Sequence, residues 1–210
     1  MDRRTFCLQA ATLAIAAAGL SGRAGAQGFT PVEGRDFRSL ARPVGVPGNG
    51  KVEVIEFFWY GCPHCFVFEP PLEAWLGRLP HDVDFRRMPV AFDARKELHQ
   101  RIFYTWDALG LVDKMHKKTF ARFHVQKKPI DSLADMVAFA QENELDAGKV
   151  QAAWNSFSVQ SRCREAKRLA EAYDIDETPA MAIGGRFVAR ARPDALVTTD
   201  VLINQVRYRA

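Results

Sequence analysis

The spacing of apolar positions changes along this chain, and each change marks a different kind of element. Between residues 52 and 58 the apolar side chains are nearly continuous and mostly β-branched or aromatic, which predicts a buried central strand. Gly61 interrupts this run. From Phe66 onward apolar residues recur at helical spacing, and we expect this helix to end at Leu79-Pro80. A buried strand is therefore expected to lead directly into a helix.

Further strand-like segments lie on either side of this unit. One precedes it at residues 37–40, and another follows it in the apolar patches at residues 83–85 and 88–92. A loop rich in proline and glycine, residues 43–50, separates the first strand from the central one. The predicted order is strand, loop, strand, helix, strand.

The pattern becomes helical from residue 94 to about residue 173. Proline is almost absent there, and apolar residues fall at intervals of three and four, which predicts four or five helices. Their stripes are Leu98, Ile102, Trp106 and Leu109; Val112, Met115, Thr119 and Phe123; Leu133, Met136, Val137 and Ala140, capped by Asp131 or Ser132; Val150, Trp154 and Phe157; and Val159, Cys163, Ala166, Ala170 and Tyr173.

Strands return near the C-terminus. A hairpin with Gly184-Gly185 at its turn precedes a last amphipathic helix that begins at Pro193. The complete pattern predicts an α/β protein.

The first residues have the pattern of a cleaved export signal. The RRTF sequence at residues 3–6 precedes an apolar run at residues 8–20, and residues 24–26 read Ala-Gly-Ala, a small-residue cleavage site. The apolar run is too short for a comfortable membrane span. We interpret residues 1–26 as a signal removed on export. The RRTF sequence also resembles a twin-arginine signal, so the Sec and twin-arginine routes both stay open.

Net charge and cysteine content argue against nucleic-acid binding and against a fold held by disulfides. The 210-residue chain has a formal net charge of +4, and the signal carries three arginines and one aspartate, so its removal leaves +2. Such a near-balanced chain gives no electrostatic reason to expect nucleic acid. The mature chain keeps Cys62, Cys65 and Cys163, too few for a disulfide framework, so the fold must depend on its core.

Cys62 and Cys65 form a Cys-Pro-His-Cys motif where the predicted strand becomes a helix. A thiol at a helix N-terminus faces unpaired N–H groups and the positive end of the helix dipole, and both favour the thiolate. The imidazole of His64 adds to this if it is protonated or donates a hydrogen bond, and Pro63 pre-sets φ of the first turn. The motif predicts an exposed, low-pKa nucleophile at Cys62 and a more buried resolving thiol at Cys65.

The CPHC motif, the preceding IEFFWYGC, the following FxFE, the helical insertion and the TPAM sequence at residues 178–181 together resemble the DsbA family of exported bacterial thiol–disulfide oxidases. The resemblance covers essentially the whole mature chain. It implies a thioredoxin fold, residues 27–93 and 174–210, interrupted by an all-helical insertion domain, residues 94–173. It also implies a periplasmic, monomeric enzyme without a cofactor. This enzyme would donate its disulfide to reduced exported polypeptides and be reoxidised by a DsbB-like, quinone-linked membrane protein.

Several residues match functional positions of that family. Cys62 matches the nucleophile and Cys65 the resolving thiol. Thr178-Pro179 matches the loop whose cis-proline faces the cysteines, although the best-known members carry valine where this chain has Thr178. This departure is expected to affect substrate handling and redox poise.

Three charged residues complete the candidate site. Glu56 matches an acidic residue buried beneath the cysteines, Arg87 stands where the family has a lysine, and Glu69 matches a further acidic residue close by. The apolar context of Glu56 also favours burial, which would raise its pKa and allow a proton-relay role. Arg87 is a permanent cation, so it pairs with Glu56 but does not relay protons.

Other interpretations stay open beside this one. A disulfide isomerase or reductase of the same fold is the alternative function, and reactivation of scrambled RNase against oxidation of a reduced peptide separates the two. A zinc site is disfavoured because structural zinc takes four ligands and the motif supplies two cysteines, so we expect no metal. Cys163 lies on an apolar stripe and is read as an ordinary core residue.

The sequence also gives expected positions for three aromatic residues before the motif and for the other histidines. Phe58, Trp59 and Tyr60 precede the motif and are candidates for lining a substrate groove. The four histidines outside the motif have no ligand-like spacing and are expected at the surface or at its boundary; they are His81, His99, His116 and His124.

Overall fold

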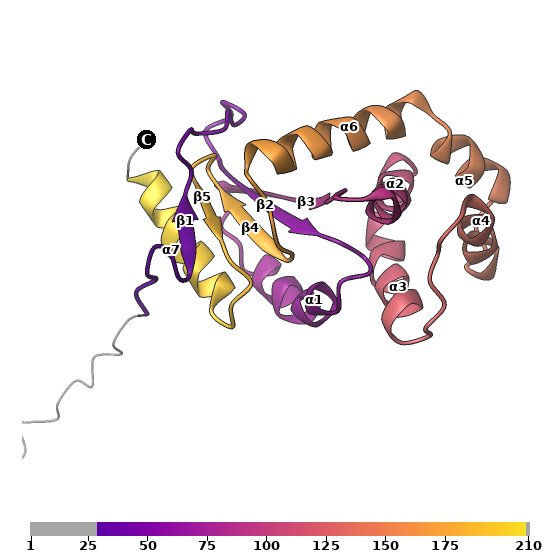
Figure 1. The fold of residues 1–210 in the computed structure, drawn as a ribbon, viewed down its shortest axis with the longest axis horizontal. Helices are drawn as coiled ribbons and strands as arrows, with labels where there is room; N and C mark the ends of the chain where they lie inside the picture. The colour runs from indigo at the N-terminus through magenta and orange to yellow at the C-terminus, as the bar shows by residue number, and fades with distance from the viewer. Residues whose placement is uncertain (1–28, 209–210) are drawn as a thin grey trace, which may run out of the picture.

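The computed structural model describes residues 29–208, so the predicted export signal at residues 1–26 lies outside the described part. Within residues 29–208 there are five strands and seven helices (Figure 1). The strands are β1 (Phe37–Ser39), β2 (Val52–Phe58), β3 (Val83–Pro89), β4 (Ala180–Ile183) and β5 (Phe187–Ala189). The helices are α1 (Pro63–Leu76), α2 (Ala94–Ala108), α3 (Val112–His124), α4 (Leu133–Glu142), α5 (Ala147–Trp154), α6 (Phe157–Ala172) and α7 (Ala195–Arg207).

The strands form one mixed sheet in the order β1-β5-β4-β2-β3. β2 pairs in parallel with β3 and antiparallel with β4, so Val54 stands between Phe85 and Ile183. Every residue of β2 is buried, which matches the nearly continuous apolar run. The α/β fold class expected from the sequence is confirmed.

Helices cover both faces of this sheet (Figure 1). α1 and α7 share one face, where Leu72 and Leu202 join a buried cluster with Val54, and Trp75 Nε1 donates a hydrogen bond to Asp200 Oδ1 at 2.7 Å. α6 crosses the other face. Burying β2 on both sides holds the end of this strand rigidly, and the cysteine motif begins there.

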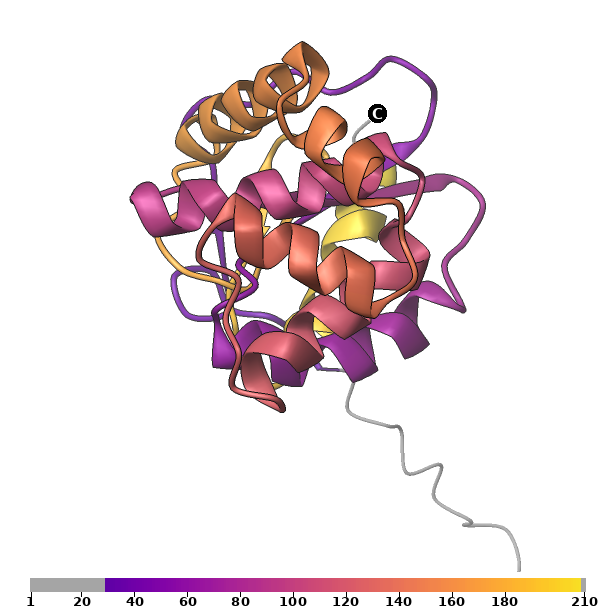
Figure 2. The same ribbon diagram turned by 90° about the vertical axis from the view of Figure 1, so that its right-hand side faces the viewer.

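Helices α2 to α5 stand together at one end of the sheet (Figure 1), and this end faces the viewer in Figure 2. Their core is continuous with that of the sheet, because Phe58 of β2 packs against Phe103 of α2 and Phe120 of α3. None of the helices in residues 29–208 has the length and apolar character needed to cross a membrane.

The structure corrects the predicted ends of two helices. α1 ends at Leu76 with Gly77 as its C-cap, three residues before the expected Leu79-Pro80 stop. Phe157 was assigned to the stripe of the fourth helix, but α5 ends at Trp154 and Phe157 begins α6, where it is 76% exposed.

Side-chain caps explain the helix starts in this region. Ser156 accepts a hydrogen bond from the backbone N–H of Val159 and thereby starts α6, which periodicity alone does not reveal. Of the two candidate caps for the third predicted helix, Ser132 accepts the hydrogen bond from the backbone N–H of Asp135.

Candidate active site

Cys62 is the N-cap residue of α1, directly after the turn that follows β2. Its Sγ accepts a hydrogen bond from the backbone N–H of Cys65 at 3.4 Å, while Pro63 occupies the first helical turn. Pro63 is tolerated there because the first N–H groups of a helix have no partner within the helix. The chain thus presents one sulfur to the open end of the helix.

The two cysteines differ strongly in acidity. The pKa of Cys62 is lowered to about 5, chiefly by a hydrogen bond from the Cys65 thiol. Partial burial opposes this effect, while hydrogen bonds from the Thr178 side chain and from the backbone N–H groups of Cys65 and His64 add to it. Burial, followed by the Cys62 sulfur and the charge of Glu56, raises the pKa of Cys65. At pH 7, Cys62 therefore favours the thiolate by about 100-fold.

The structure corrects two expectations about Cys62: its exposure and the way in which His64 affects it. Cys62 is only 7% exposed and Cys65 is fully buried, so only a small part of the Cys62 side chain reaches the surface. His64 has an exposed side chain and lowers the pKa of Cys62 through its backbone N–H, whereas we had expected a contribution from its imidazole. Both cysteines are free thiols here, as is Cys163.

The segment at Thr178-Pro179 lies against Cys62, although it is far away in the sequence. The peptide bond between these two residues is cis, and the carbonyl oxygen of Thr178 lies 3.4 Å from Cys62 Sγ. When Cys62 is protonated, this carbonyl accepts a hydrogen bond from its thiol. A backbone segment thereby forms one wall beside the Cys62 sulfur.

Trp59 packs closely on Gly61 and closes another side. A Cβ atom added at Gly61 would lie 2.3 Å from Cζ2 of Trp59, so only glycine fits this approach. Trp59 Nε1 donates a hydrogen bond to His99 Nδ1 at 2.7 Å, and Lys96 Nζ lies 4.9 Å from the centre of a Trp59 ring. The turn before Cys62 is thus held by residues of α2.

Tyr60 connects the same turn to α3. Its hydroxyl lies 2.9 Å from His116 Nδ1, and its carbonyl oxygen lies 2.7 Å from His124 Nε2. His124 also stacks on Phe66 of α1, with ring centres 4.9 Å apart. Three histidines from the helical region therefore contact the segment around the motif.

This arrangement corrects the expectation of a surface or boundary position for His99 and His116, whereas His81 is exposed and His124 is half-buried, as expected. His99 and His116 are 1% and 3% exposed. The overlooked signal is the spacing of His116, Phe120 and His124, which places them on one side of α3 beside the apolar stripe. Phe58 and Tyr60 are also fully buried, so Trp59 alone of the three candidate groove residues is partly exposed.

Glu56 and Arg87 meet beneath the motif. Glu56 is fully buried on β2, and its Oε2 lies 3.3 Å from Arg87 Nε on the neighbouring strand. The geometry of this ion pair is too poor for a hydrogen bond, and no other group of residues 29–208 donates one to the Glu56 carboxyl. Burial, together with the charge of Glu69, raises the pKa of Glu56 to about 8.

The carboxyl group of Glu69 on α1 has more polar partners than that of Glu56. Its Oε1 lies 3.1 Å from His116 Nε2, and its Oε2 accepts a hydrogen bond from Arg87 Nη2 at 3.2 Å. Burial opposes the charge of Glu69, but these contacts outweigh it and lower its pKa. The structure therefore brings Glu56, Glu69 and Arg87 together in one buried group.

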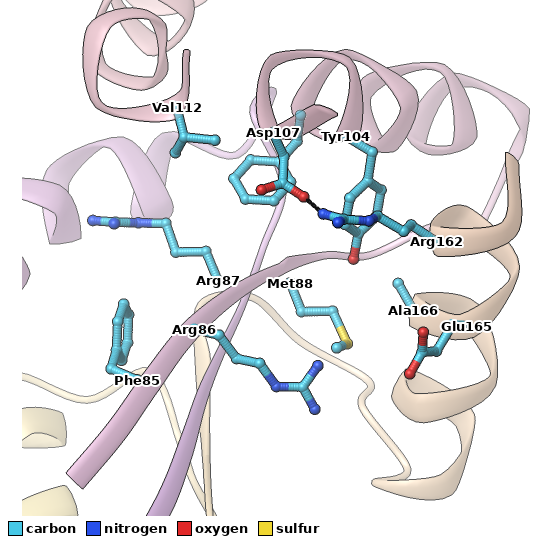
Figure 3. A pocket seen from close by; sticks show the side chains of 11 residues that line it. Phe85, Arg86, Arg87, Met88, Tyr104, Asp107, Val112, Arg162, Glu165 and Ala166 are labelled. Carbon is cyan, nitrogen blue, oxygen red and sulfur yellow. Dashed lines mark ion pairs between the residues drawn. The ribbon is translucent and has the colours of Figure 1, made fainter. Parts of the chain in front are cut away.

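A cavity of about 520 Å³ lies beside β3 and is also lined by residues of α2, α3 and α6 (Figure 3), and neither Cys62 nor Cys65 lines it. Phe85 and Arg87 leave β3 on one side and Arg86 on the other, as alternation in a strand requires. Arg86 is paired with Glu53 at 3.0 Å, and Arg162 with Asp107. Arg87, which lines this cavity, also belongs to the buried group with Glu56 and Glu69.

A metal centre finds no support in the described residues. Within residues 29–208 no cluster of three or more histidine, cysteine or acidic side chains has a metal-binding arrangement. Cys163 is partly buried on α6, and its burial raises the pKa of its thiol to about 11, so it lacks the acidity of Cys62.

Comparison with known proteins gives consistent matches. A family model for the DSBA-like thioredoxin domain matches residues 53–199. The thiol:disulfide interchange protein DsbA of Azotobacter vinelandii is 37% identical over 190 residues, covering 87% of this chain and 89% of that protein. The protein of the same name from Burkholderia cepacia is 37% identical over 194 residues, covering 89% and 91%.

Solved structures agree. The crystal structure of Pseudomonas aeruginosa DsbA has a TM-score of 0.78 at 32% identity and covers 83% of this chain and 93% of its own. The oxidoreductase DsbA from Xylella fastidiosa has a TM-score of 0.80 at 27% identity and covers 85% and 98%.

Proposed function

The chain belongs to the family of DSBA-like thioredoxin-domain proteins and is a thiol–disulfide oxidoreductase, and from this premise we propose that Cys62 and Cys65 are the pair with which it oxidises its substrates. The single observation that carries the proposal is the opposite acidity of the two thiols, with the pKa of Cys62 lowered to about 5 and that of Cys65 raised. A stabilised Cys62 thiolate favours the dithiol form, so the disulfide is readily donated.

The oxidation proceeds in two exchanges. A substrate thiolate attacks Cys62 Sγ, the bond between Cys62 and Cys65 breaks, and its electron pair passes to Cys65 Sγ. A second substrate thiolate then attacks the substrate sulfur of the mixed disulfide and releases Cys62 as a thiolate. The substrate leaves with a new disulfide, and the protein is left with two reduced cysteines.

The first exchange needs a proton at Cys65. A leaving thiol with a raised pKa departs slowly unless it is protonated, because the anion that forms is poorly stabilised. Glu56 is the proposed donor, since its carboxyl is buried and its pKa of about 8 leaves it protonated at neutral pH. In Glu56→Gln the rate of mixed-disulfide formation is expected to fall and to lose its dependence on pH near 8; an unchanged profile would remove this role.

The residues around Cys62 receive supporting roles. The backbone of Thr178-Pro179 offers hydrogen bonds to an extended substrate segment beside the sulfur. Pro63 and His64 tune the redox pair by shaping the first turn, from which backbone N–H groups point at Cys62. Arg87 holds Glu56 and Glu69 together.

Family membership implies substrate proteins and a membrane partner in general. We further propose that the substrates are reduced exported polypeptides, and that a DsbB-like, quinone-linked membrane protein reoxidises Cys62 and Cys65. The enzyme acts in the periplasm as a monomer after cleavage of residues 1–26. Its helical segment, residues 94–173, is proposed as an insertion domain because it contains helices α2 to α6 and no strand and stands between β3 and β4.

The reduction potential of the Cys62–Cys65 pair tests the direction of the reaction. We expect the protein to oxidise a reduced two-cysteine peptide stoichiometrically, and Cys62→Ser to abolish this activity. In a glutathione buffer the pair should be more oxidising than glutathione. A potential as negative as that of thioredoxin, about −270 mV, would contradict an oxidase. Strong reactivation of scrambled RNase with weak peptide oxidation would instead indicate an isomerase.

A further inference from the structure

We propose that His116 of α3 is a positioning residue that holds the negative charge of a buried carboxyl pair on Glu69 and thereby keeps Glu56 protonated for the leaving sulfur of Cys65. The inference rests on the proposed function of the two cysteines and extends it to a residue of the helical region.

Glu69 is placed as an anion by its contacts. One oxygen faces His116 Nε2 at 3.1 Å and the other accepts a hydrogen bond from Arg87 Nη2 at 3.2 Å. Glu56 has only the ion pair with Arg87 Nε at 3.3 Å and accepts no hydrogen bond within the described residues. A buried carboxylate is stabilised by hydrogen-bond donors, so a single negative charge shared by the pair resides on Glu69.

The hydrogen bonds of His116 define its tautomer. Burial lowers the pKa of His116, so its imidazole is neutral, and burial raises the pKa of Tyr60 well above its ordinary value, so its hydroxyl keeps its proton. The Tyr60 hydroxyl donates to Nδ1 at 2.9 Å, which leaves the proton of His116 on Nε2. Nε2–H then donates to Glu69. The opposite tautomer would turn a lone pair toward the carboxylate.

The carboxyl pair has charged and titratable neighbours on every element that packs around it. The titratable and charged groups that face Glu56, Glu69 and His116 are Arg87 from β3, Cys65 and Glu73 from α1, Tyr60 from the turn before α1, and Lys117 from α3. Glu73 shares Arg87 Nη2 at 2.7 Å and is also paired with Lys117 at 3.0 Å. Because Arg87 serves three carboxylates, it cannot by itself stabilise all of them, and His116 supplies the additional donor.

Removing His116 would therefore move the charge. Without the Nε2–H donor, the buried Glu69 takes up a proton, its repulsion on Glu56 disappears, and Arg87 is left to stabilise an ionised Glu56. An ionised Glu56 has no proton to give, and its charge raises the pKa of Cys65 further. In the intact protein Glu56 gives its proton to Cys65 Sγ when the disulfide breaks, and it regains this proton from Cys65 when the disulfide re-forms.

The test measures mixed-disulfide formation between the oxidised protein and a reduced single-cysteine peptide. Rate constants are expressed per peptide thiolate from about pH 5 to pH 9. For the wild type we expect the rate to fall near pH 8, where Glu56 loses its proton. In His116→Phe this fall should move down by about one pH unit or more, with a rate at pH 7 about tenfold lower. His116→Gln retains an N–H donor and an oxygen acceptor and should keep the wild-type profile.

Two further variants keep the test decisive. Glu69→Gln should shift the fall in the same direction as His116→Phe, and the double variant should shift it no further, because both act through one charge. This comparison also serves if His116→Phe folds poorly. His81→Gln removes an exposed histidine and is the matched control, expected to leave the profile unchanged. Carboxyl-carbon NMR of the reduced protein should show Glu69 titrating below Glu56 in the wild type and above it in His116→Phe.

Failure of this inference is distinguishable from failure of the proposed function. A His116→Phe profile that keeps its pH dependence, or falls by the same factor at every pH, would leave His116 with a purely structural role. Wild-type peptide oxidation that survives Cys62→Ser would instead overturn the redox role of the cysteines, whatever His116 does.

Discussion

The backbone N–H of Cys65 donates a hydrogen bond to Cys62 Sγ at 3.4 Å, and the thiol of the same Cys65 is the strongest influence lowering the pKa of Cys62. In the proposed mechanism Cys65 therefore has two tasks: its sulfur leaves when a substrate thiolate attacks the disulfide, and its N–H and thiol stabilise Cys62 as an anion. Cys62 needs this help because it is largely withdrawn from water.

Replacing Cys65 should consequently make Cys62 less acidic. Cys65→Ala removes the thiol donor but keeps the backbone N–H, so the pKa of Cys62 should rise from about 5 by roughly one unit or more. Thiolate absorbance near 240 nm, followed against pH, measures the midpoint. An unchanged midpoint would show that the helix N-terminus alone accounts for the acidity of Cys62.

Stability of the reduced protein should depend on pH through Cys62. Its pKa is lower in the folded state, about 5, than in the unfolded chain, about 8.5. At pH values between these two pKa values the unfolded state binds more protons than the folded state. The contribution of the Cys62 thiolate to the free energy of unfolding is therefore fully present above the unfolded pKa and is lost as pH falls toward 5. The difference in unfolding free energy between reduced wild type and Cys62→Ser should rise with pH across this window, by at most about 1.4 kcal/mol per unit. A flat difference would contradict the lowered pKa.

Gly61 should be intolerant of a side chain as long as Trp59 is present. The added Cβ of Gly61→Ala would lie 2.3 Å from the Trp59 ring, whose indole N–H is held by His99. We expect a loss of about 1–3 kcal/mol in unfolding free energy. In a Trp59→Ala background the same change should cost less than about 0.5 kcal/mol, which urea denaturation of the four proteins measures. Equal costs in both backgrounds would disprove the contact.

Cys163 should be chemically silent beside Cys62. Its pKa of about 11 leaves almost no thiolate at pH 6, whereas Cys62 at about 5 is mostly ionised. Iodoacetamide at pH 6 should therefore modify Cys62 alone in reduced mature protein, as peptide mass spectrometry would show. Cys163→Ala should oxidise the test peptide at the wild-type rate, and a slower rate would indicate a functional third thiol.

The strand–helix unit around the motif was predictable from local sequence. An unbroken apolar run, a glycine and a helical stripe place Cys62 at the start of α1, because these signals act between residues a few positions apart. Local pattern was less reliable at helix ends, where single capping residues such as Ser156 and Gly77 decide the boundary.

The partners of Cys62 and Glu56 were not predictable from residue spacing. The resemblance supplied Thr178, Glu69 and Arg87 as neighbours, but nothing in the sequence alone places Thr178 O beside a sulfur 116 positions earlier. No pattern indicated that His116 Nε2 lies 3.1 Å from Glu69 Oε1, although the two residues are 47 positions apart. Contacts between residues far apart in the sequence do not repeat at regular spacing, so the pattern of residues along the chain does not reveal them.

The sequence by itself determined that one sulfur begins a helix behind a buried strand, because hydrophobic spacing and helix-start chemistry operate over a few residues. The tertiary structure decided which distant polar groups surround that sulfur and the carboxyl beneath it. The physical reason is burial: the protonation of Cys62, Glu56 and His116 depends on how far each is withdrawn from water and on which donors reach it, and packing of the sheet against the helices creates both conditions.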